Sequence, residues 1–336
     1  MIETIYIEED ARDHPRTLEI LERFPRARRV ECERYGEVFN RRAQNFRLQK
    51  RRPALILARK VQGRVLPTPP GYGIGAARNF YFSHMLNCLY DCRYCFLQGM
   101  YQSAHYVVFV NYEDFFADIA AENDAGGLDQ SCFFSGYDCD SLAFEGVTGF
   151  VEAALPHFRA MKGAWLELRT KSVHVAPLLK AEPFSRCVIA WSFTPQEVSD
   201  DVEPQVPSVE RRLRAMAQVQ ERGWQIGLRL DPLIRMQNFE EAYRRLFADI
   251  FSTIDGERVH SVSLGPMRLP APFFRRVERL YPDVPLFAGQ FSDYKGTVSY
   301  PHSEESVMLD FCRRELLRYI KPGTFFTCEL PTSEST

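Results

Sequence analysis

Apolar and β-branched runs of strand length alternate with longer segments of helical period over most of the chain. Six runs have the length and composition of buried strands, namely 79–85, 131–136, 164–170, 187–193, 224–232 and 259–265. Segments of helical character follow most of them, at 111–123, 145–159, 208–222, 238–252 and 270–281. A six-fold alternation of this kind predicts parallel strands connected by helices. We therefore expect an α/β fold, a partial (β/α)6 TIM-like barrel.

The regions on either side of these repeats carry weaker patterns. Residues 66–75, LPTPPGYGIG, concentrate Pro and Gly and indicate a connector. We predict an irregular, basic N-terminal segment with its linker at 1–70 and the barrel at 71–285. A C-terminal part at 286–336 is expected to contain a strand or hairpin region and a closing helix, the latter within 304–320.

Polar segments follow the later strands of the predicted barrel. SGYDCD, RTKS, SFTP, RLDP and LGPM leave strands two to six in turn. In a parallel βα barrel the carboxyl ends of the strands share one rim, where ligands bind. Arg229, Asp231 and Arg235 leave the fifth strand, and they suit either phosphate or polar substrate groups, or an ion pair of Arg with Asp.

Composition and charge narrow the class of protein. The 336 residues are 45% hydrophobic with a net charge of −2, which is typical of a globular protein. The first residues show no secretory or transit pattern, and no long uncharged apolar run occurs, so we expect a cytoplasmic protein without a membrane segment. Residues 26–60 carry twelve Lys and Arg against three Glu. Such a block suits phosphate binding, or a solvated flank.

Three of the nine cysteines lie together directly after the first predicted strand. The stretch NCLYDCRYCFLQG places Cys88, Cys92 and Cys95 at the spacing C-x3-C-x2-C. Three thiolates leave a tetrahedral site incomplete, so either His84 completes a Cys3His zinc site or one position stays open, as in a [4Fe–4S] cluster held by three cysteines. We favour the cluster, because His84 falls in the predicted strand, where its side chain points across the sheet.

The cysteine spacing after the first strand of a six-fold βα chain resembles the signature of radical S-adenosylmethionine enzymes. Longer segments resemble the spore photoproduct lyase family, whose members split a crosslinked thymine dimer in DNA. These segments are CRYCFLQGMY, LELRTKSVHVAPLL, AWSF and GLRLDPLIRMQNFEEAYRRLF. The resemblance extends over nearly the whole chain.

This resemblance implies cofactors, partners and site residues. It implies a [4Fe–4S] cluster on the three loop cysteines, whose open iron binds S-adenosylmethionine, with Lys171, Ser192 and Tyr94 beside that cofactor. One electron then cleaves the cofactor to a 5′-deoxyadenosyl radical, which requires a donor such as flavodoxin or ferredoxin. DNA is the implied substrate partner.

The chain departs from the family pattern at the hydrogen donor. The family returns hydrogen from a cysteine at the end of the second strand, relayed by two tyrosines. Here Tyr137 stands at the position of that cysteine, and Cys139 lies two residues later. Phe96 replaces the second relay tyrosine, which leaves Tyr94 as the other. If the chain stays extended, positions 137 and 139 face the same side, and we expect Cys139 or Tyr137 to be the donor. The alternative is that Cys139 is simply a small buried residue.

A second departure lies near residues 291–300. FSDYKGTVSY is shorter than the Arg- and Tyr-rich hairpin of the family and carries only Lys295 as a cation, although base flipping needs contacts that offset unstacking. We predict a radical S-adenosylmethionine lyase acting on a thymine lesion. The alternatives are radical chemistry on RNA or a peptide, and a metal-bearing nucleic-acid-binding module without catalysis.

Overall fold

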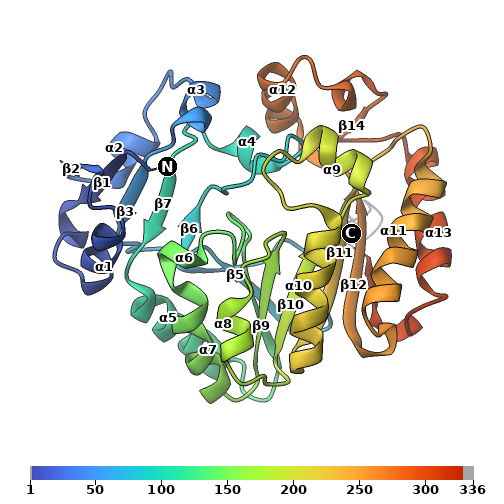
Figure 1. Cartoon of the computed structure of the whole chain (residues 1–336), viewed down its shortest axis with the longest axis horizontal. Coiled ribbons are helices and arrows are strands. Elements are labelled where there is room, and N and C mark those ends of the chain that lie inside the picture. Colours follow the sequence, from blue (N-terminus) through green and yellow to red (C-terminus); the bar gives the residue numbers. More distant parts are fainter. Residues whose placement is uncertain (1, 328–336) are drawn as a thin grey trace.

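A curled eight-stranded sheet forms the centre of the molecule (Figure 1). The structure is a computed structural model that describes residues 2–327. The strand order is β16-β12-β11-β10-β9-β8-β5-β4, parallel throughout except for β4. The strands are β4 (Val65–Pro67), β5 (Arg78–Phe82), β8 (Ser131–Ser135), β9 (Ala164–Thr170), β10 (Cys187–Ser192), β11 (Gln225–Leu233), β12 (Val259–Pro266) and β16 (Phe325–Thr327). The predicted α/β half-barrel is confirmed, since β5 and β8 to β12 coincide with the six predicted strands.

Apolar side chains on both faces hold this sheet in place. Every residue of β8 and of β10 is buried, as is usual for parallel strands covered by helices. The helix predicted at 145–159 is divided at Gly149, whose φ of +57° takes it out of helical conformation. The helices on the outer side of the sheet in Figure 1 are α5 (Tyr112–Ala125), α6 (Glu145–Thr148), α7 (Phe150–Ala160), α8 (Ala176–Lys180), α10 (Val209–Arg222), α11 (Phe239–Thr253) and α13 (His302–Leu316).

The N-terminal segment is a folded layer, which corrects the prediction that it is irregular. Its parallel sheet has the order β2-β1-β3-β7, with β6 antiparallel at the edge. The pattern missed it because the strands are short and β2, RRVEC, has no buried residue. Moreover, β6 and β7 lie on either side of the cysteine loop in the sequence, and therefore outside the segment in which the N-terminal part was expected. The elements are β1 (Thr4–Glu8), α1 (Pro15–Arg23), β2 (Arg28–Cys32), α2 (Tyr35–Phe39), α3 (Phe46–Arg51), β3 (Leu55–Ala58), β6 (Met85–Leu86) and β7 (Tyr106–Phe109).

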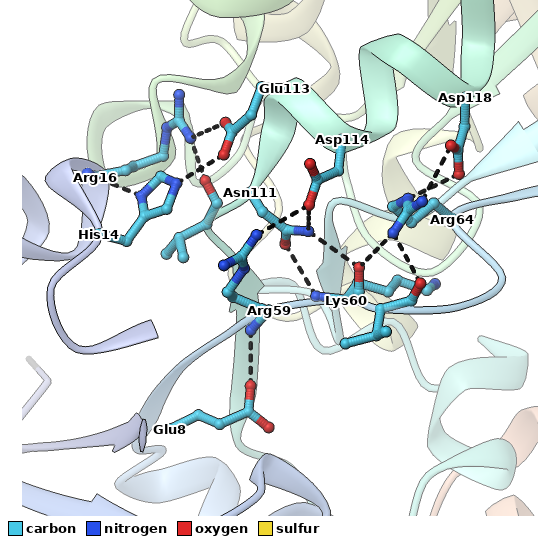
Figure 2. Close-up of polar contacts among 12 residues, drawn as sticks. Glu8, His14, Arg16, Arg59, Lys60, Arg64, Asn111, Glu113, Asp114 and Asp118 are labelled. Carbon is cyan, nitrogen blue, oxygen red and sulfur yellow. Dashed lines mark hydrogen bonds and ion pairs between the residues drawn. The ribbon is translucent and has the colours of Figure 1, made fainter. Parts of the chain in front are cut away.

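A row of polar contacts joins this layer to the start of α5 (Figure 2). Carboxylates are favoured near a helix N-terminus by the helix dipole, and here they also meet basic partners. Arg59 and Lys60 belong to the basic block 26–60, so part of that block serves the fold. The side chain of Asn111 accepts from the backbone N–H of Lys60 at 2.9 Å. The ion pairs are Arg16–Glu113 (3.6 Å), Arg59–Asp114 (3.2 Å) and Arg64–Asp118 (2.7 Å), and the ring of His14 lies within hydrogen-bond distance of Glu113 (2.9 Å).

The predicted C-terminal hairpin and closing helix are present. β14 (Ser292–Tyr294) and β15 (Thr297–Ser299) pair through a tight turn in which Lys295 and Gly296 have φ of +53° and +89°. β13 (Arg268–Pro270) extends this small sheet, and α12 (Ala271–Leu280) follows it. The last residues of the predicted C-terminal part, 328–336, lie outside the described residues. None of the helices within 2–327 combines the length and apolar character needed to cross a bilayer.

Candidate active site

A cavity of about 370 Å³ opens at the carboxyl edge of the half-barrel. The loops after the central strands supply its lining, as the sequence predicted, and this size suits a small-molecule site. The connector 66–75 was not expected there, yet its residues 69–72 form part of the wall. The lining residues from the strand ends are Gly136, Tyr137, Cys139, Asp140, Arg169, Thr170, Lys171, Ser192, Asp231, Pro232, Met267, Arg268 and Leu269.

Cys88, Cys92 and Cys95 all line this cavity. Burial raises the pKa of Cys88 to about 12 and raises those of the other two thiols, so metal binding has to displace a proton from each sulfur. Among residues 2–327 no three His, Cys, Asp or Glu side chains converge on a single-metal site. A zinc ion needs its sulfurs within about 2.3 Å of one point, whereas a cubane takes one sulfur on each of three irons. Three cysteines that line one cavity are the ligand number that a [4Fe–4S] cluster with one open iron requires.

His84 lies apart from the cysteine thiols, so the Cys3His zinc alternative is wrong. Its imidazole is buried and stacks on Phe150, with ring centroids 3.7 Å apart and an interplanar angle of 9°. Burial lowers the pKa of His84 to about 3. The reason differs from the predicted one, because β5 already ends at Phe82 and His84 is not in the strand.

Side chains from α3 and α4 (Phe96–Met100) fix the course of the cysteine loop. The ammonium of Lys50 donates to the carbonyls of Cys88 (3.3 Å) and Tyr90 (3.4 Å). The amide of Gln98 donates to the carbonyl of Cys92 at 2.7 Å. These bonds satisfy backbone groups that the tight loop leaves without partners in regular structure.

The helices α4 and α12 pack against each other next to the cysteine loop. A Cβ at Gly99 would lie 2.7 Å from Cα of Phe273, so only glycine permits this approach of the two helices. From the end of α12, the hydroxyl of Tyr281 donates to the carboxylate of Asp91 at 3.1 Å. The close packing of α4 on α12 thus fixes the loop from a part of the chain almost two hundred residues away.

The three predicted cofactor residues, Tyr94, Lys171 and Ser192, line the same cavity. Tyr94 and Lys171 share one hydrogen-bond partner, Glu203. The sequence did not reveal this partner, because Glu203 lies in a charged stretch, PQEVSDDVEP, which is typical of an exposed helix. The ammonium of Lys171 donates to Glu203 at 3.0 Å, and the hydroxyl of Tyr94 donates to the same carboxylate. Burial by itself raises the pKa of Glu203, but Lys171 and Arg212 lower it to about 2.

Asp140 fixes the backbone beside Lys171. Its carboxylate accepts from the N–H of Lys171 at 2.6 Å and from the hydroxyl of Thr170 at 2.7 Å. Burial raises the pKa of Asp140, although these hydrogen bonds oppose the shift. The sequence placed Asp140 on the rim without a role, since its partners come from the next strand.

Tyr137 and Cys139 both line the cavity, but not through the extended alternation that was expected. The chain turns sharply after β8, because Gly136 has a φ of +88°. Tyr137 stacks on Tyr81, with ring centroids 4.3 Å apart. Cys139 is buried and packs against the core of the N-terminal layer. The structure therefore leaves both residues as hydrogen-donor candidates.

Aromatic side chains form one side of the cavity around Tyr137. Phe96, which takes the position of the second relay tyrosine, lies 5.6 Å from the ring of Tyr137 between centroids. Tyr72, from the connector, lies 6.1 Å from the same ring, and the guanidinium of Arg169 lies 5.4 Å from the ring of Tyr72. Faces of this kind can stack on planar bases.

The three charged residues expected at the exit of β11 do not form one group. Arg229 is fully buried inside the half-barrel, where it donates to Glu167 at 2.6 Å, so it is not available to phosphate. Asp231 lines the cavity 3.9 Å from Arg268. Arg235 pairs with a glutamate of α13 at 3.0 Å. Asp231 therefore has its arginine partner in Arg268, outside this set, because Arg229 is held by Glu167 inside the half-barrel and Arg235 lies beyond the end of β11.

A half-barrel whose three-cysteine loop opens onto a cavity at the carboxyl edge is the architecture of the radical S-adenosylmethionine superfamily. Within it, the model of the spore photoproduct lyase family matches residues 78–286, and the chain belongs to that family. Two curated relatives are the spore photoproduct lyases of a Geobacillus species (27% identical over 202 residues) and of Bacillus subtilis (25% over 202 residues). Each alignment spans 59% of this chain and 59% of the relative.

Solved structures extend the likeness of the fold to almost the whole chain. A cysteine-to-serine mutant of spore photoproduct lyase has a TM-score of 0.85 at 21% identity, over 98% of both chains. A mutant with bound AdoMet and dinucleoside spore photoproduct also reaches 0.85 at 21% identity, over 98% of this chain and 99% of its own. The N-terminal layer is thus part of the shared fold.

Proposed function

We propose that this protein is a radical S-adenosylmethionine lyase that repairs a crosslinked thymine lesion in DNA. The observation that carries the proposal is that three loop cysteines and the three cofactor residues all line one cavity of the described structure. The solved lyase with bound AdoMet and dinucleoside spore photoproduct has the same fold. Family membership supports the same reaction for this chain.

Cys88, Cys92 and Cys95 hold the cluster in this proposal, and Lys171, Ser192 and Tyr94 hold S-adenosylmethionine beside it. When bound, the two cofactors supply a 5′-deoxyadenosyl radical that takes a hydrogen atom from the lesion. The ammonium of Lys171 provides a charge-assisted contact for the cofactor carboxylate.

Hydrogen return falls to Tyr137 or Cys139. After the crosslinking C–C bond breaks, the substrate radical needs one hydrogen atom, which a thiol or a phenol can supply. The donor is then left as a thiyl or phenoxyl radical, which a hydrogen atom from 5′-deoxyadenosine would restore. Tyr94 is the remaining relay tyrosine of the family pattern, and it lines the cavity next to two cluster cysteines. The aromatic side formed by Phe96, Tyr72 and Tyr137 supports a nucleobase as substrate, since bases stack on such faces.

The reaction needs one electron from outside the protein. A flavodoxin or ferredoxin suits this role, and such donors work in the cytoplasm. The eight described cysteines are all unpaired, which is in keeping with a reducing compartment.

Anaerobic reconstitution with iron and sulfide tests the first half of the proposal. Purified protein should turn brown, and with dithionite and S-adenosylmethionine it should release 5′-deoxyadenosine. A colourless protein that holds one zinc ion would support a binding module without catalysis.

A dinucleotide that carries the thymine crosslink tests the second half. Recovery of free thymidine units, dependent on S-adenosylmethionine, would support lesion repair. Cofactor cleavage without thymidine recovery would place the same radical chemistry on another substrate, such as RNA or a peptide.

A further inference from the structure

One buried ion pair behind the cavity wall reaches all three proposed cofactor residues. Glu203 accepts from the ammonium of Lys171 at 3.0 Å and from the hydroxyl of Tyr94. Arg212 donates to the carbonyl of Ser192 at 2.9 Å, and it pairs with Glu203 at 3.4 Å. Neither Glu203 nor Arg212 lines the cavity itself. The pair therefore supports the wall without contacting a ligand.

Glu203 has a complete set of donors around it. Besides Lys171, Tyr94 and Arg212, its carboxylate accepts from the hydroxyls of Ser199 (2.9 Å) and Thr194 (3.0 Å). The side chains of Glu203 and Arg212 are both fully buried. A buried carboxylate with so many donors has one defined position and keeps its charge.

Backbone hydrogen bonds attach this part of α9 (Gln196–Val202) to the cysteine loop. The N–H of Arg93 donates to the carbonyl of Val202 at 2.8 Å, and the N–H of Asp91 donates to the carbonyl of Pro204 at 3.2 Å. These bonds lie on either side of Glu203. The carboxylate is thereby held at a fixed place relative to the proposed cluster ligands.

We propose that Glu203 and Arg212 are positioning residues for S-adenosylmethionine. This inference rests on the proposed function, because it takes Lys171 as the partner of the cofactor carboxylate. A lysine ammonium is a point charge on a flexible stem and has three donors. Glu203 takes one donor and orients the stem, so the others are directed to the cavity. Lys171, Glu203 and Arg212 together carry one net positive charge, which matches one carboxylate.

A purely structural pair is the competing explanation. Buried ion pairs contribute little net stability, and replacing both partners by neutral groups is often harmless, whereas removing one is costly. The structural explanation predicts that a neutral replacement of the pair leaves cofactor recognition intact. The positioning role predicts that recognition of the carboxylate is lost even in a stable protein.

The test compares the dissociation constants of S-adenosylmethionine and of decarboxylated S-adenosylmethionine for the reconstituted full chain. The dissociation constant of the decarboxylated form divided by that of S-adenosylmethionine reports the contribution of the carboxylate, and this ratio does not depend on the fraction of folded protein. Lys171→Ala should lower this ratio by about 10- to 100-fold, the effect of one charge-assisted hydrogen bond. Glu203→Gln should reproduce at least half of this change on a logarithmic scale.

Two further variants keep the test decisive. The double variant Glu203→Gln with Arg212→Met removes both fully buried charges and leaves only the ammonium of Lys171, which lines the cavity, so it should fold yet keep the lowered ratio. Glu145→Gln is the matched control, since Glu145 is another buried carboxylate, which accepts from the N–H of Val151 at 3.0 Å at the start of α7. Its ratio should equal that of the wild type.

The outcomes separate this inference from the proposed function. If Lys171→Ala lowers the ratio while the double variant stays within two-fold of the wild type, the positioning role is wrong and the cofactor site stands. If Lys171→Ala itself leaves the ratio unchanged, the assignment of the carboxylate to Lys171 fails, and the inference fails with it.

Discussion

The ring of Tyr137 lies stacked on that of Tyr81, with centroids 4.3 Å apart. Tyr137 takes the position at which the family has its hydrogen-donating cysteine, so the stack assigns this side chain a role in shaping the cavity. Cys139 lies two residues further on and also lines the cavity, with its thiol in the protonated form because burial raises its pKa. A protonated thiol is the form that can give a hydrogen atom.

Hydrogen return should therefore depend on Cys139. We expect Cys139→Ala to lower thymidine recovery from a lesion dinucleotide several-fold without reducing the release of 5′-deoxyadenosine. Tyr137→Phe keeps the ring on Tyr81 and removes only the hydroxyl, so its product ratio should match the wild type. Liquid chromatography of both products measures the two quantities. A deficit in Tyr137→Phe with a normal Cys139→Ala would make the tyrosine the donor.

Cluster assembly should require each loop cysteine. We expect Cys92→Ala to lose most of the iron and the brown colour after anaerobic reconstitution, because two sulfurs cannot anchor the cubane in place of three. Iron and sulfide analysis and the visible absorption spectrum measure this. Cys187→Ala is the control, since Cys187 is buried at the amino end of β10, away from the cavity. Equal iron content in all three proteins would remove the cysteine loop as the cluster site.

Glu203 should make stability depend on pH in the acid range. Although burial alone raises its pKa, Lys171 and Arg212 hold it at about 2, below the ordinary value of 4.5. A lowered carboxyl pKa contributes stability above pH 4.5 that is lost as the pH falls toward 2, here up to about 3 kcal/mol. The stability advantage of the wild type over Glu203→Gln should shrink over this range.

Urea denaturation at several pH values between 7 and 3 measures that advantage. The Glu203→Gln protein lacks the titrating carboxyl, so its free energy of unfolding should fall less on acidification. A constant difference between the two proteins across this range would contradict an ionised Glu203 in the native state.

The hairpin tip should contribute modestly to DNA binding. Lys295 stands in the turn between β14 and β15, and one phosphate contact changes the slope of log affinity against log salt by about 0.9. We expect Lys295→Ala to weaken binding of duplex DNA about two- to three-fold. We also expect it to reduce the magnitude of that slope by the value of about one phosphate contact.

Fluorescence anisotropy with a lesion-free duplex at several salt concentrations measures this effect. Lys162→Ala is the control, because Lys162 is exposed just before β9, at the opposite end of the half-barrel from the cavity. An equal loss in both variants would mean that the hairpin has no special contact with DNA.

Local pattern was enough to predict the half-barrel and the cysteine loop. The core strands are apolar on both faces, and strand and helix periods differ, so each of the six units is readable within about thirty residues. Cys88, Cys92 and Cys95 are close in sequence and directly follow the first predicted strand, so the strand pattern placed them at the rim. The motif segments around Lys171 and Ser192 placed those residues on the same rim, since strand ends of one parallel sheet must coincide there.

Contacts between distant segments were not readable in this way. Glu203 looks like part of an exposed helix, and only the packing of α9 on the cysteine loop brings it to Tyr94 and Lys171. The turn at Gly136 ends the extended alternation that was assumed for the residues after β8. The N-terminal layer is likewise hidden, because its strands are short and β3 gains its second partner from β7, beyond the cysteine loop.

The sequence by itself determined the strands of the half-barrel and the kind of ligand that its cysteine loop offers, because hydrophobic period and ligand type are properties of neighbouring residues. The tertiary structure alone decided that His84 stacks on Phe150 in the core, that Arg229 pairs inside the barrel, and that a buried Glu203 stands behind the cofactor residues. Those outcomes depend on which side chains meet across loops and layers. A charged side chain that is buried there must be paired, so its position is fixed by its partner.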